Sequence, residues 1–226
     1  EAIRQMSRLE WRTGLSQVTP GRIHVRGYDI ADLIRRASFG DMVYLLLKGE
    51  WPARREGALV EAILVSSADH SLAAPSTDAT RLVASSGVPL PAAVAAGLLA
   101  VGEHHGGAIE RCAQLMQEAL PQSAPSEADV VNAARGLIGD LRARRERMPG
   151  YGHPVHPTDP RVAPLFARAA ELGLAGRWVA LAQAIEQALL DATGRPLPIN
   201  VDGAIAALLL EMALDWRAGK AFFLIS

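Results

Sequence analysis

Histidines gather at three turns of this sequence. His70 lies in SADHSLAAPST, His104 and His105 come directly before two glycines in EHHGGA, and His153 and His156 share the stretch GYGHPVH. A neutral imidazole can bind a metal, exchange a proton near neutral pH or donate a hydrogen bond. A histidine at a helix end can equally cap the helix or stay solvated. Their concentration in glycine- and proline-rich turns favours a reactive site for the set.

A metal centre is the first chemistry that such histidines suggest, and the sequence does not support it. There is no HEXXH motif, and no cysteine pair or nearby acid completes a set of four ligands. GYGHPV lacks the third glycine and the βαβ context of a dinucleotide loop, and no phosphate-binding P-loop motif occurs. We expect no metal and no tightly bound cofactor.

Asp202 is the acidic residue whose position favours chemistry. It follows Asn200 in PINVDGAIAALLLEMAL, in the expected first turn of an apolar helix. Exposed backbone amides and the helix dipole favour a charged carboxylate there. Taken alone, Asp202 also fits an acid that only stabilises the start of a helix.

Capping and proline signals predict a series of helices that would position these residues. Ser38 with Asp41 forms a capping box ahead of MVYLLLKG, which Gly49 ends, and Asn200 is the expected N-cap of the helix that carries Asp202. PQSAPS is the most linker-like stretch, and GRIHVRGYD favours a minor hairpin. Further helices are expected over residues 54–68, 76–86, 91–101, 108–120, 126–145 (with Ser126 and Asp129 as its capping pair), 159–172, 177–192, 201–214 and from 216 onward.

Composition agrees with a helical globular protein. Of the 226 residues, 50% are hydrophobic, mainly the helix formers Ala and Leu, and 5% are aromatic. The net charge of −1 provides no basic field for nucleic acid. No apolar run is long enough to span a membrane, EAIRQMSRLEWRTG lacks the core of a signal peptide, and the lone Cys112 is expected as a small buried hydrophobe. We expect a cytoplasmic protein without nucleic-acid or membrane partners.

Five stretches, in chain order, resemble motifs of the citrate synthase superfamily. GRIHVRGYDIADLIRRASFGDMVYLLLKGEWP is similar to its N-terminal RGY segment, DHSLAAPSTDATRLVAS to its H-x-x-N-A-S-T helix, and HHGGA to its HGGA turn. PGYGHPVHPTDPR is similar to its GYGH loop that ends in DPR, and NVD to its aspartate motif. The resemblance runs from about residue 13 to the end of the sequence.

This resemblance implies an all-α fold of two domains with a substrate cleft between them. The large domain would comprise residues 1–106 and 196–226 and would continue past Ser226, where the family carries a further arginine for a substrate carboxylate. The small domain would comprise residues 107–195. Members of the family work as dimers, so a homodimer or a higher homo-oligomer is implied.

The resemblance also implies roles for five residues. His105 would hold the thioester oxygen, His153 would activate the keto acid carbonyl, and Asp202 would be the base. His70 and Arg161 would bind the carboxylates of oxaloacetate or citrate. These residue types fit the chemistry, because removing a proton beside a thioester carbonyl needs a base and a donor to the enolate oxygen.

The turn around His105 carries two further expectations. His105 would stand at the positive end of the helix expected from Ala108, which disfavours a second proton and leaves a neutral donor. Gly106 and Gly107 would let the backbone turn tightly. His104 is expected to be a neighbour that packs beside the site or supports one of its residues.

The nucleotide of CoA is expected along RARRERMPGYG. Backbone amides of a glycine-rich turn can meet adenine, and arginines offer charge to phosphates. Each arginine would also fit a solvated basic face at a helix end. The expected contacts are Arg144, Arg145, Arg147, Gly150, Tyr151 and Gly152.

Departures from the family motifs bear on the activity. Ala73 stands at the asparagine position of H-x-x-N-A-S-T and Pro75 precedes the serine, while HPVHP replaces a common H-R-V-Y-K. A proline variant of the loop and a short chain look more like the citryl-CoA lyase branch. We expect an acyltransferase of the citrate synthase type that condenses acetyl-CoA with oxaloacetate, as in the tricarboxylic acid cycle. The alternatives are a citryl-CoA lyase, a 2-methylcitrate synthase and an inactive CoA-binding scaffold.

Overall fold

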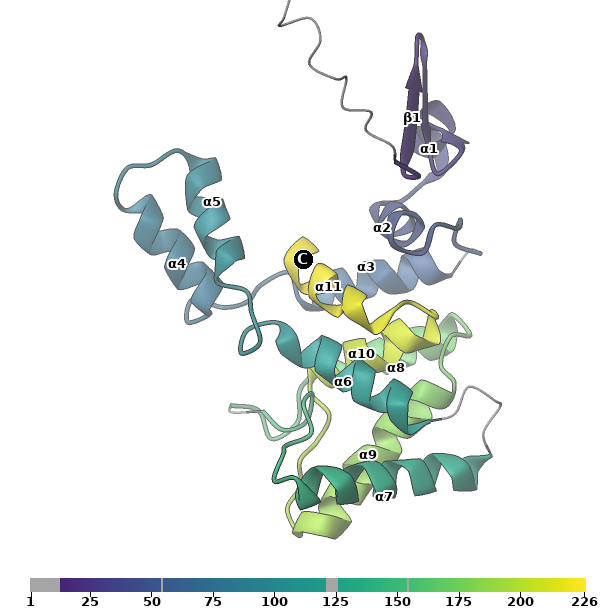
Figure 1. The fold of residues 1–226 in the computed structure, drawn as a ribbon, viewed down its shortest axis with the longest axis vertical. Helices are drawn as coiled ribbons and strands as arrows, with labels where there is room; N and C mark the ends of the chain where they lie inside the picture. Colours follow the sequence, from purple (N-terminus) through teal and green to yellow (C-terminus); the bar gives the residue numbers. More distant parts are fainter. Residues whose placement is uncertain (1–12, 54, 121–125, 154) are drawn as a thin grey trace, which may run out of the picture.

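A computed structural model describes residues 13–53, 55–120, 126–153 and 155–226. The fold is all-α apart from one small sheet, as expected (Figure 1). Most of the N-terminal stretch without a signal-peptide core, most of the PQSAPS linker and the expected helix start at Arg54 lie outside the described residues. Within those ranges, no helix combines the length and the apolar character needed to cross a membrane.

The helices follow the expected order along the chain. One helix, α1, was not predicted, and its N-cap is Asp29, whose side chain accepts the Ala31 N–H. The helix expected from residue 159 begins at Val162, because Asp159 and Arg161 form a turn ahead of it. The helices are α1 (Ile30–Arg36), α2 (Phe39–Lys48), α3 (Glu56–Ser66), α4 (Pro75–Ala84), α5 (Leu90–Leu99), α6 (Gly107–Ala119), α7 (Glu127–Ala143), α8 (Val162–Glu171), α9 (Arg177–Thr193), α10 (Val201–Glu211), the short 3₁₀ helix η2 (Trp216–Ala218) and α11 (Gly219–Ile225).

Local capping explains where several helices start and stop. At α2, Ser38 Oγ accepts the Asp41 N–H at 3.2 Å, and Asp41 accepts the Ser38 N–H at 2.9 Å, which is the predicted capping box. Gly49 ends α2 in the left-handed region at φ 88°. The same reciprocal pair starts α7 at Ser126 and Asp129.

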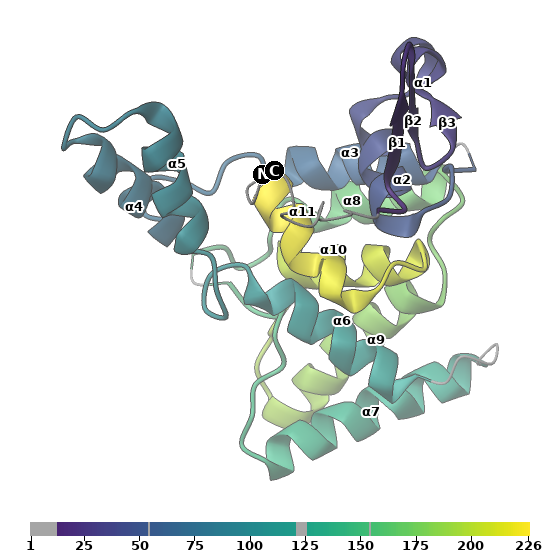
Figure 2. The same ribbon diagram turned by 45° about the horizontal axis from the view of Figure 1, so that its top comes forward.

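The expected hairpin is present and carries a third short strand. Strands β1 (Ser16–Thr19), β2 (Arg22–Val25) and β3 (Tyr28–Asp29) form an antiparallel sheet in the order β1-β2-β3. The β1 and β2 register pairs residue 16 with 25, and β2 meets β3 through residues 24 and 29. Figures 1 and 2 show this sheet beside α1, which contacts β2 and β3.

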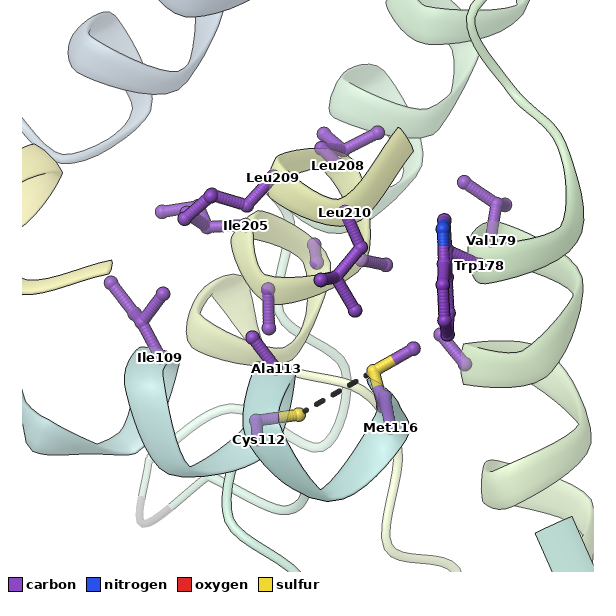
Figure 3. Packing of buried hydrophobic residues seen from close by; sticks show 14 of the residues in the cluster. Ile109, Cys112, Ala113, Met116, Trp178, Val179, Ile205, Leu208, Leu209 and Leu210 are labelled. Atoms are coloured by element: carbon purple, nitrogen blue, oxygen red, sulfur yellow. Dashed lines mark hydrogen bonds between the residues drawn. The ribbon is translucent and has the colours of Figure 1, made fainter. Parts of the chain in front are cut away.

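The core forms where α6, α9 and α10 meet (Figure 3). Helix α10 is apolar on all sides and almost wholly buried, which is typical of a central helix. Cys112 is fully buried on α6, with its Sγ 3.8 Å from Met116 Sδ. Burial raises the pKa of this thiol, so the prediction of a small buried hydrophobe is confirmed.

Helices α4 and α5 form a hairpin that projects from the body (Figures 1 and 2). The two helices pack on each other, and α4 buries none of its residues. In the body, α6 packs on α10, η2 and α11, whereas α7 pairs with α9. The division into domains at residues 106 and 196 stays a prediction.

Candidate functional site

The turn of residues 150–152 is tied to the start of α10. Gly152 N donates to Pro198 O at 2.7 Å, and Asn200 N donates to Gly150 O at 3.0 Å. Asn200 also donates from Nδ2 to Gly152 O at 2.8 Å, while its Oδ1 accepts the Asp202 N–H at 3.0 Å. One asparagine therefore caps α10, as predicted, and holds the turn that precedes His153.

This contact is close because two glycines meet. Gly150 has φ 82°, and a Cβ built there would lie 2.7 Å from Gly203 Cα. A Cβ on Gly203 would lie 2.4 Å from Gly150 O. Side chains at either position would push the turn away from Asp202. The sequence reasoning did not single out Gly203, although its place directly after Asp202 was the available signal.

Asp202 lies half-buried at the start of α10, among ionisable groups of several segments. Burial raises its pKa most, and Asp159 raises it further. Arg161, His153 and His70 act in the opposite direction, and the net pKa stays above the usual value. The helix start was expected to favour the charged carboxylate, and burial outweighs that effect here. A raised pKa makes Asp202 a stronger base.

His153 lies half-buried after the glycine turn, and its ring has one defined donor. Its Nδ1 accepts the backbone N–H groups of Val155 at 3.1 Å and His156 at 3.0 Å. We therefore assign the proton of the neutral ring to Nε2. A donor with this orientation suits the carbonyl oxygen of a keto acid.

His105 is held by Ser76 of the first turn of α4. Its Nε2 lies 2.8 Å from Ser76 Oγ and accepts the Ser76 backbone N–H at 3.4 Å. We therefore assign the proton of the neutral ring to Nδ1. Burial and then the neighbouring His70 lower the pKa of His105. The lowered pKa agrees with the neutral imidazole that was expected, and burial is the largest cause of the shift.

Phe223 of α11 packs against both His70 and His105. Its ring stacks on His70 at 4.1 Å between centroids and meets His105 edge-on at 4.9 Å. Its carbonyl oxygen lies 3.3 Å from His70 Nε2. The turn between His105 and the start of α6 needs a glycine at position 106. Gly106 has φ 94°, and an added Cβ there would lie 2.9 Å from the Phe223 ring. His104 is exposed, so the packing role expected for it is wrong, and a role in supporting a site residue stays a prediction.

Arg161 forms a two-fold hydrogen-bonded pair with Asp159. Its Nε and Nη2 each donate to a different carboxylate oxygen at 2.8 Å. Asp159 is 1% exposed. Burial by itself would raise its pKa, but hydrogen bonds from Arg161 and the Val201 N–H lower it to about 2. The pKa of Arg161 is raised in turn, first by its hydrogen bond to Asp159.

The five residues expected to do the chemistry share one neighbourhood. His70 lies 6.1 Å from His105 between ring centroids, and His70, His153 and Arg161 all influence the pKa of Asp202. Three residues that support this site were not predicted. Ser76 and Asp159 belong to the stretches that resemble family motifs, whereas Phe223 in the apolar FFLIS carries no such signal.

A cavity of about 920 Å³ lies beside His153, between α7, α9 and the glycine turn. Arg147, Tyr151 and Gly152 line it, as expected for a nucleotide site. Arg142 and Arg195 line it too and were not predicted, although Arg142 opens the stretch RARRERMPGYG. Three cations around one cavity suit the phosphates of CoA.

The other expected CoA contacts lie elsewhere. Arg144 lines a separate hollow between α6 and α7, and Gly150 is buried against Gly203. Arg145 is exposed, with φ 58°, and is not among the residues that line the large cavity. In the described part of the chain, no group of three or more His, Cys, Asp or Glu side chains could hold a metal ion.

Comparisons with known proteins agree with the motif assignment. A family model described as citrate synthase, C-terminal domain, matches residues 3–62 and 53–226. "Putative citrate synthase 2" of Mycobacterium tuberculosis is 33% identical over 169 residues, which are 72% of this chain and 42% of that protein. The chain thus spans less than half the length of this relative.

Two solved structures are similar over most of the chain. The structure of citryl-CoA lyase from Hydrogenobacter thermophilus has 39% identity and a TM-score of 0.86, covering 95% of this chain and 81% of that one. ATP citrate lyase from Methanothrix soehngenii, in complex with citrate and coenzyme A, has 20% identity and a TM-score of 0.81. It covers 99% of this chain and 38% of that one, and at this identity the likeness concerns the fold alone.

Proposed function

The chain belongs to the citrate synthase family, and we propose that it cleaves citryl-CoA into acetyl-CoA and oxaloacetate. The observation that carries the direction of the reaction is the 39% identity to a citryl-CoA lyase, along 95% of this chain and 81% of that one. The sequence alone put the synthase first. The lyase is preferred here, because the 39% identity to the citryl-CoA lyase exceeds the 33% identity to the putative citrate synthase.

The thioester half of the reaction would fall to His105 and Asp202. When the carbon–carbon bond of citryl-CoA breaks, its electron pair passes to the acetyl thioester and makes an enolate. His105, neutral with its proton assigned to Nδ1, would donate to the enolate oxygen. Asp202, whose raised pKa helps it to hold a proton, would then protonate the enolate carbon.

The keto acid half would fall to His153, Arg161 and His70. The tertiary hydroxyl of citryl-CoA gives its proton to water as it becomes the ketone of oxaloacetate, and Asp202 regains from water the proton that it delivers to the enolate carbon. His153 would hold this oxygen through Nε2–H, since Nδ1 is occupied by two backbone donors. Arg161 and His70 would bind carboxylates of the substrate.

One assay tests the direction. Purified full-length protein is given citryl-CoA, and separately acetyl-CoA with oxaloacetate, while free thiol and oxaloacetate are followed. Oxaloacetate from citryl-CoA, without thiol release from the second mixture, supports the lyase. Thiol release from acetyl-CoA and oxaloacetate supports the synthase instead. CoA binding without turnover of either mixture would contradict both enzyme activities and would support an inactive CoA-binding scaffold.

The second candidate is citrate synthase, which adds hydrolysis of the thioester. The match to the putative citrate synthase favours it, and Asp202 would serve as the base that removes the acetyl proton. Propionyl-CoA in the same assay tests a 2-methylcitrate synthase, because one methylene changes pocket contacts by only about 1–3 kcal/mol.

The remaining proposals concern ligands and assembly. CoA would enter as part of the substrate, with no tightly bound cofactor and with its phosphates near Arg142, Arg147 and Arg195. A homodimer or a higher homo-oligomer is proposed from the family resemblance. Sedimentation velocity of the full-length protein checks it, and a monomer at micromolar concentration would contradict it.

A further inference from the structure

The turn Asp159-Pro160-Arg161 contains a buried charge whose role the proposed reaction leaves open. Both carboxylate oxygens of Asp159 accept hydrogen bonds from the Arg161 guanidinium, and Oδ1 also accepts the Arg161 backbone N–H at 3.1 Å. The side chain is 1% exposed. Burying a carboxylate is costly unless it is paired, so a fold that buries this one needs a compensating arrangement.

The chain holds a second copy of this turn on its surface. In Asp215-Trp216-Arg217, Asp215 Oδ1 accepts the Arg217 backbone N–H at 2.9 Å and Nε at 2.8 Å, and Nη2 donates to Oδ2. Here the Arg217 and Asp215 side chains are 72% and 49% exposed. The Asp-x-Arg turn therefore forms without burial, and its hydrogen bonds alone do not explain why Asp159 is buried.

Among the described residues, the buried copy has one contact that the exposed copy lacks. Asp159 Oδ2 accepts the Val201 N–H at 2.9 Å, from the first residue of α10 and 42 positions along the chain. Asp202 is the next residue. A single carboxylate thus contacts both the candidate carboxylate-binding arginine and the helix end that carries the candidate base.

We propose that Asp159 is a positioning residue that holds Arg161 toward the substrate carboxylate and away from Asp202. Without this hold, Arg161 and Asp202 would be free to pair, which would remove the cation for the substrate and weaken the base. The inference rests on the proposed function, in which Arg161 binds a carboxylate and Asp202 exchanges the proton.

The electrostatic effects of Asp159 and Arg161 on Asp202 agree with these separate roles for the three residues. Asp159 raises the pKa of Asp202, and Arg161 lowers it. The two members of the pair therefore act on the base with opposite signs. The other ionisable groups around Asp202 are His153 of the glycine turn, His70 before α4 and Cys112 of α6.

A carboxyl titration by ¹³C NMR of the full-length protein tests the proposal, with Asp202→Asn used to assign the Asp202 signal. Asp159→Asn is expected to lower the pKa of Asp202 by about 1, because a negative neighbour is lost and Arg161 is released. Arg161→Gln is expected to raise it. Asp215→Asn, the matched change in the exposed copy, should leave it unchanged.

An unchanged pKa of Asp202 in the Asp159→Asn variant would overturn the proposal. Shifts of the same sign in Asp159→Asn and Arg161→Gln would also overturn it, because a general loosening of the protein around Asp202 predicts the same sign for both variants. If Asp159→Asn does not fold, the rise in Arg161→Gln carries the test, and its absence is the contrary result. The titration needs no turnover. An inactive wild type with these opposite shifts would contradict the proposed function while supporting the coupling.

Turnover gives a second measurement if the wild type is active. Asp159→Asn should raise the KM for citryl-CoA about tenfold or more, because an arginine that loses its orientation grips a carboxylate less well. Asp215→Asn should keep the wild-type KM. Equal effects of the two variants would contradict a positioning role.

Discussion

A carboxyl group that exchanges a proton with carbon must compete for that proton with water, and burial is the usual way to strengthen it. Asp202 follows this rule: it is half-buried, and burial is the largest cause of its raised pKa. Three cationic or ionisable neighbours, His70, His153 and Arg161, limit the rise. The same site keeps His105 neutral, because burial opposes its second proton. Burial thus prepares both groups for the enolate chemistry that we propose.

Replacing Asp202 with asparagine tests this chemistry. We expect Asp202→Asn to slow solvent exchange of the acetyl protons of acetyl-CoA by about 10²–10⁴-fold, because the base is lost. CoA binding, measured by calorimetry, should stay within twofold of the wild type. Asp191→Asn, on the exposed face of α9, is the control and should exchange normally. Normal exchange in Asp202→Asn would mean that the base is another residue.

The pH dependence of this exchange has a definite sign. The basic form of Asp202 is present above its pKa, and that pKa lies above the usual aspartate value. Exchange by the wild type should therefore fall as the pH drops through the raised pKa. NMR of the acetyl signal from neutral to acidic pH measures it. A midpoint at or below the ordinary aspartate range would contradict the environment described for Asp202.

At the scale of elements, the site depends on how helices begin. Asn200 caps α10 through Oδ1 and holds the glycine turn through Nδ2. Gly106 starts α6 in a left-handed conformation that places His105 beside Ser76 and Phe223. Both helix starts bring a catalytic candidate to the site and stabilise the fold. Substitutions there should affect stability and activity together.

Asn200→Ala is expected to lower the free energy of unfolding by about 1–2 kcal/mol, because a cap and a hydrogen bond to Gly152 O are lost. Activity should fall as well, since the turn before His153 loses its tie. Ser126→Ala is the matched control, because it removes the exposed cap of α7. It should cost about 1 kcal/mol without lowering kcat. Urea denaturation measures the stability of the two variants, and the lyase assay measures their kcat. An equal kcat in the two variants would argue that the hydrogen bond from Asn200 to Gly152 O does not hold the turn before His153 for catalysis.

Gly106→Ala tests the other helix start. Its positive φ of 94° and the Phe223 ring, 2.9 Å from where the alanine Cβ would lie, predict a loss of at least about 1–2 kcal/mol in stability. Gly139→Ala, in the exposed interior of α7, is the control, because nothing lies within 4 Å of its Cβ. That change should stabilise the protein by about 0.5–1 kcal/mol. Thermal or urea unfolding compares them, and a stable Gly106→Ala variant would contradict the described turn.

At the scale of the whole molecule, the cavity beside His153 is made by segments far apart in the sequence. Arg142 lies in the last turn of α7, Arg147 precedes the glycine turn, and Arg195 follows α9. The pairing of α7 with α9 brings them around one space. The arginines of the stretch RARRERMPGYG therefore lie at different places. Arg142 and Arg147 line the cavity, whereas Arg144 lies on another face of α7.

This division predicts which arginines bind CoA. Arg147→Ala and Arg195→Ala should each weaken CoA binding about tenfold or more, because a charge-assisted contact to a phosphate is lost. Arg144→Ala should bind as the wild type does. Isothermal titration calorimetry with CoA measures all three. Weaker binding in Arg144→Ala alone would place the nucleotide on the other face of α7.

The sequence by itself determined what is local. Helix starts at Ser38, Ser126 and Asn200 were readable, because a cap and the amides that it binds lie within three or four residues of each other. The candidate residues His70, His105, His153, Arg161 and Asp202 came from a resemblance in short motifs, and their individual roles stay predictions. The unpredicted α1 has a local cap at Asp29, but a helix of 7 residues carries few signals in the sequence.

Only the tertiary structure decided how charges meet. Burial, together with Asp159, raises the pKa of Asp202 against the local preference of a helix start, and no short stretch of sequence reports burial. The same holds for the pair of glycines at 150 and 203, for Phe223 beside two histidines, and for Asp159 bound to an amide 42 residues away. The physical reason is that hydrogen bonds at a helix start join neighbours in the chain, whereas desolvation and long-range contacts depend on the packing of the whole molecule.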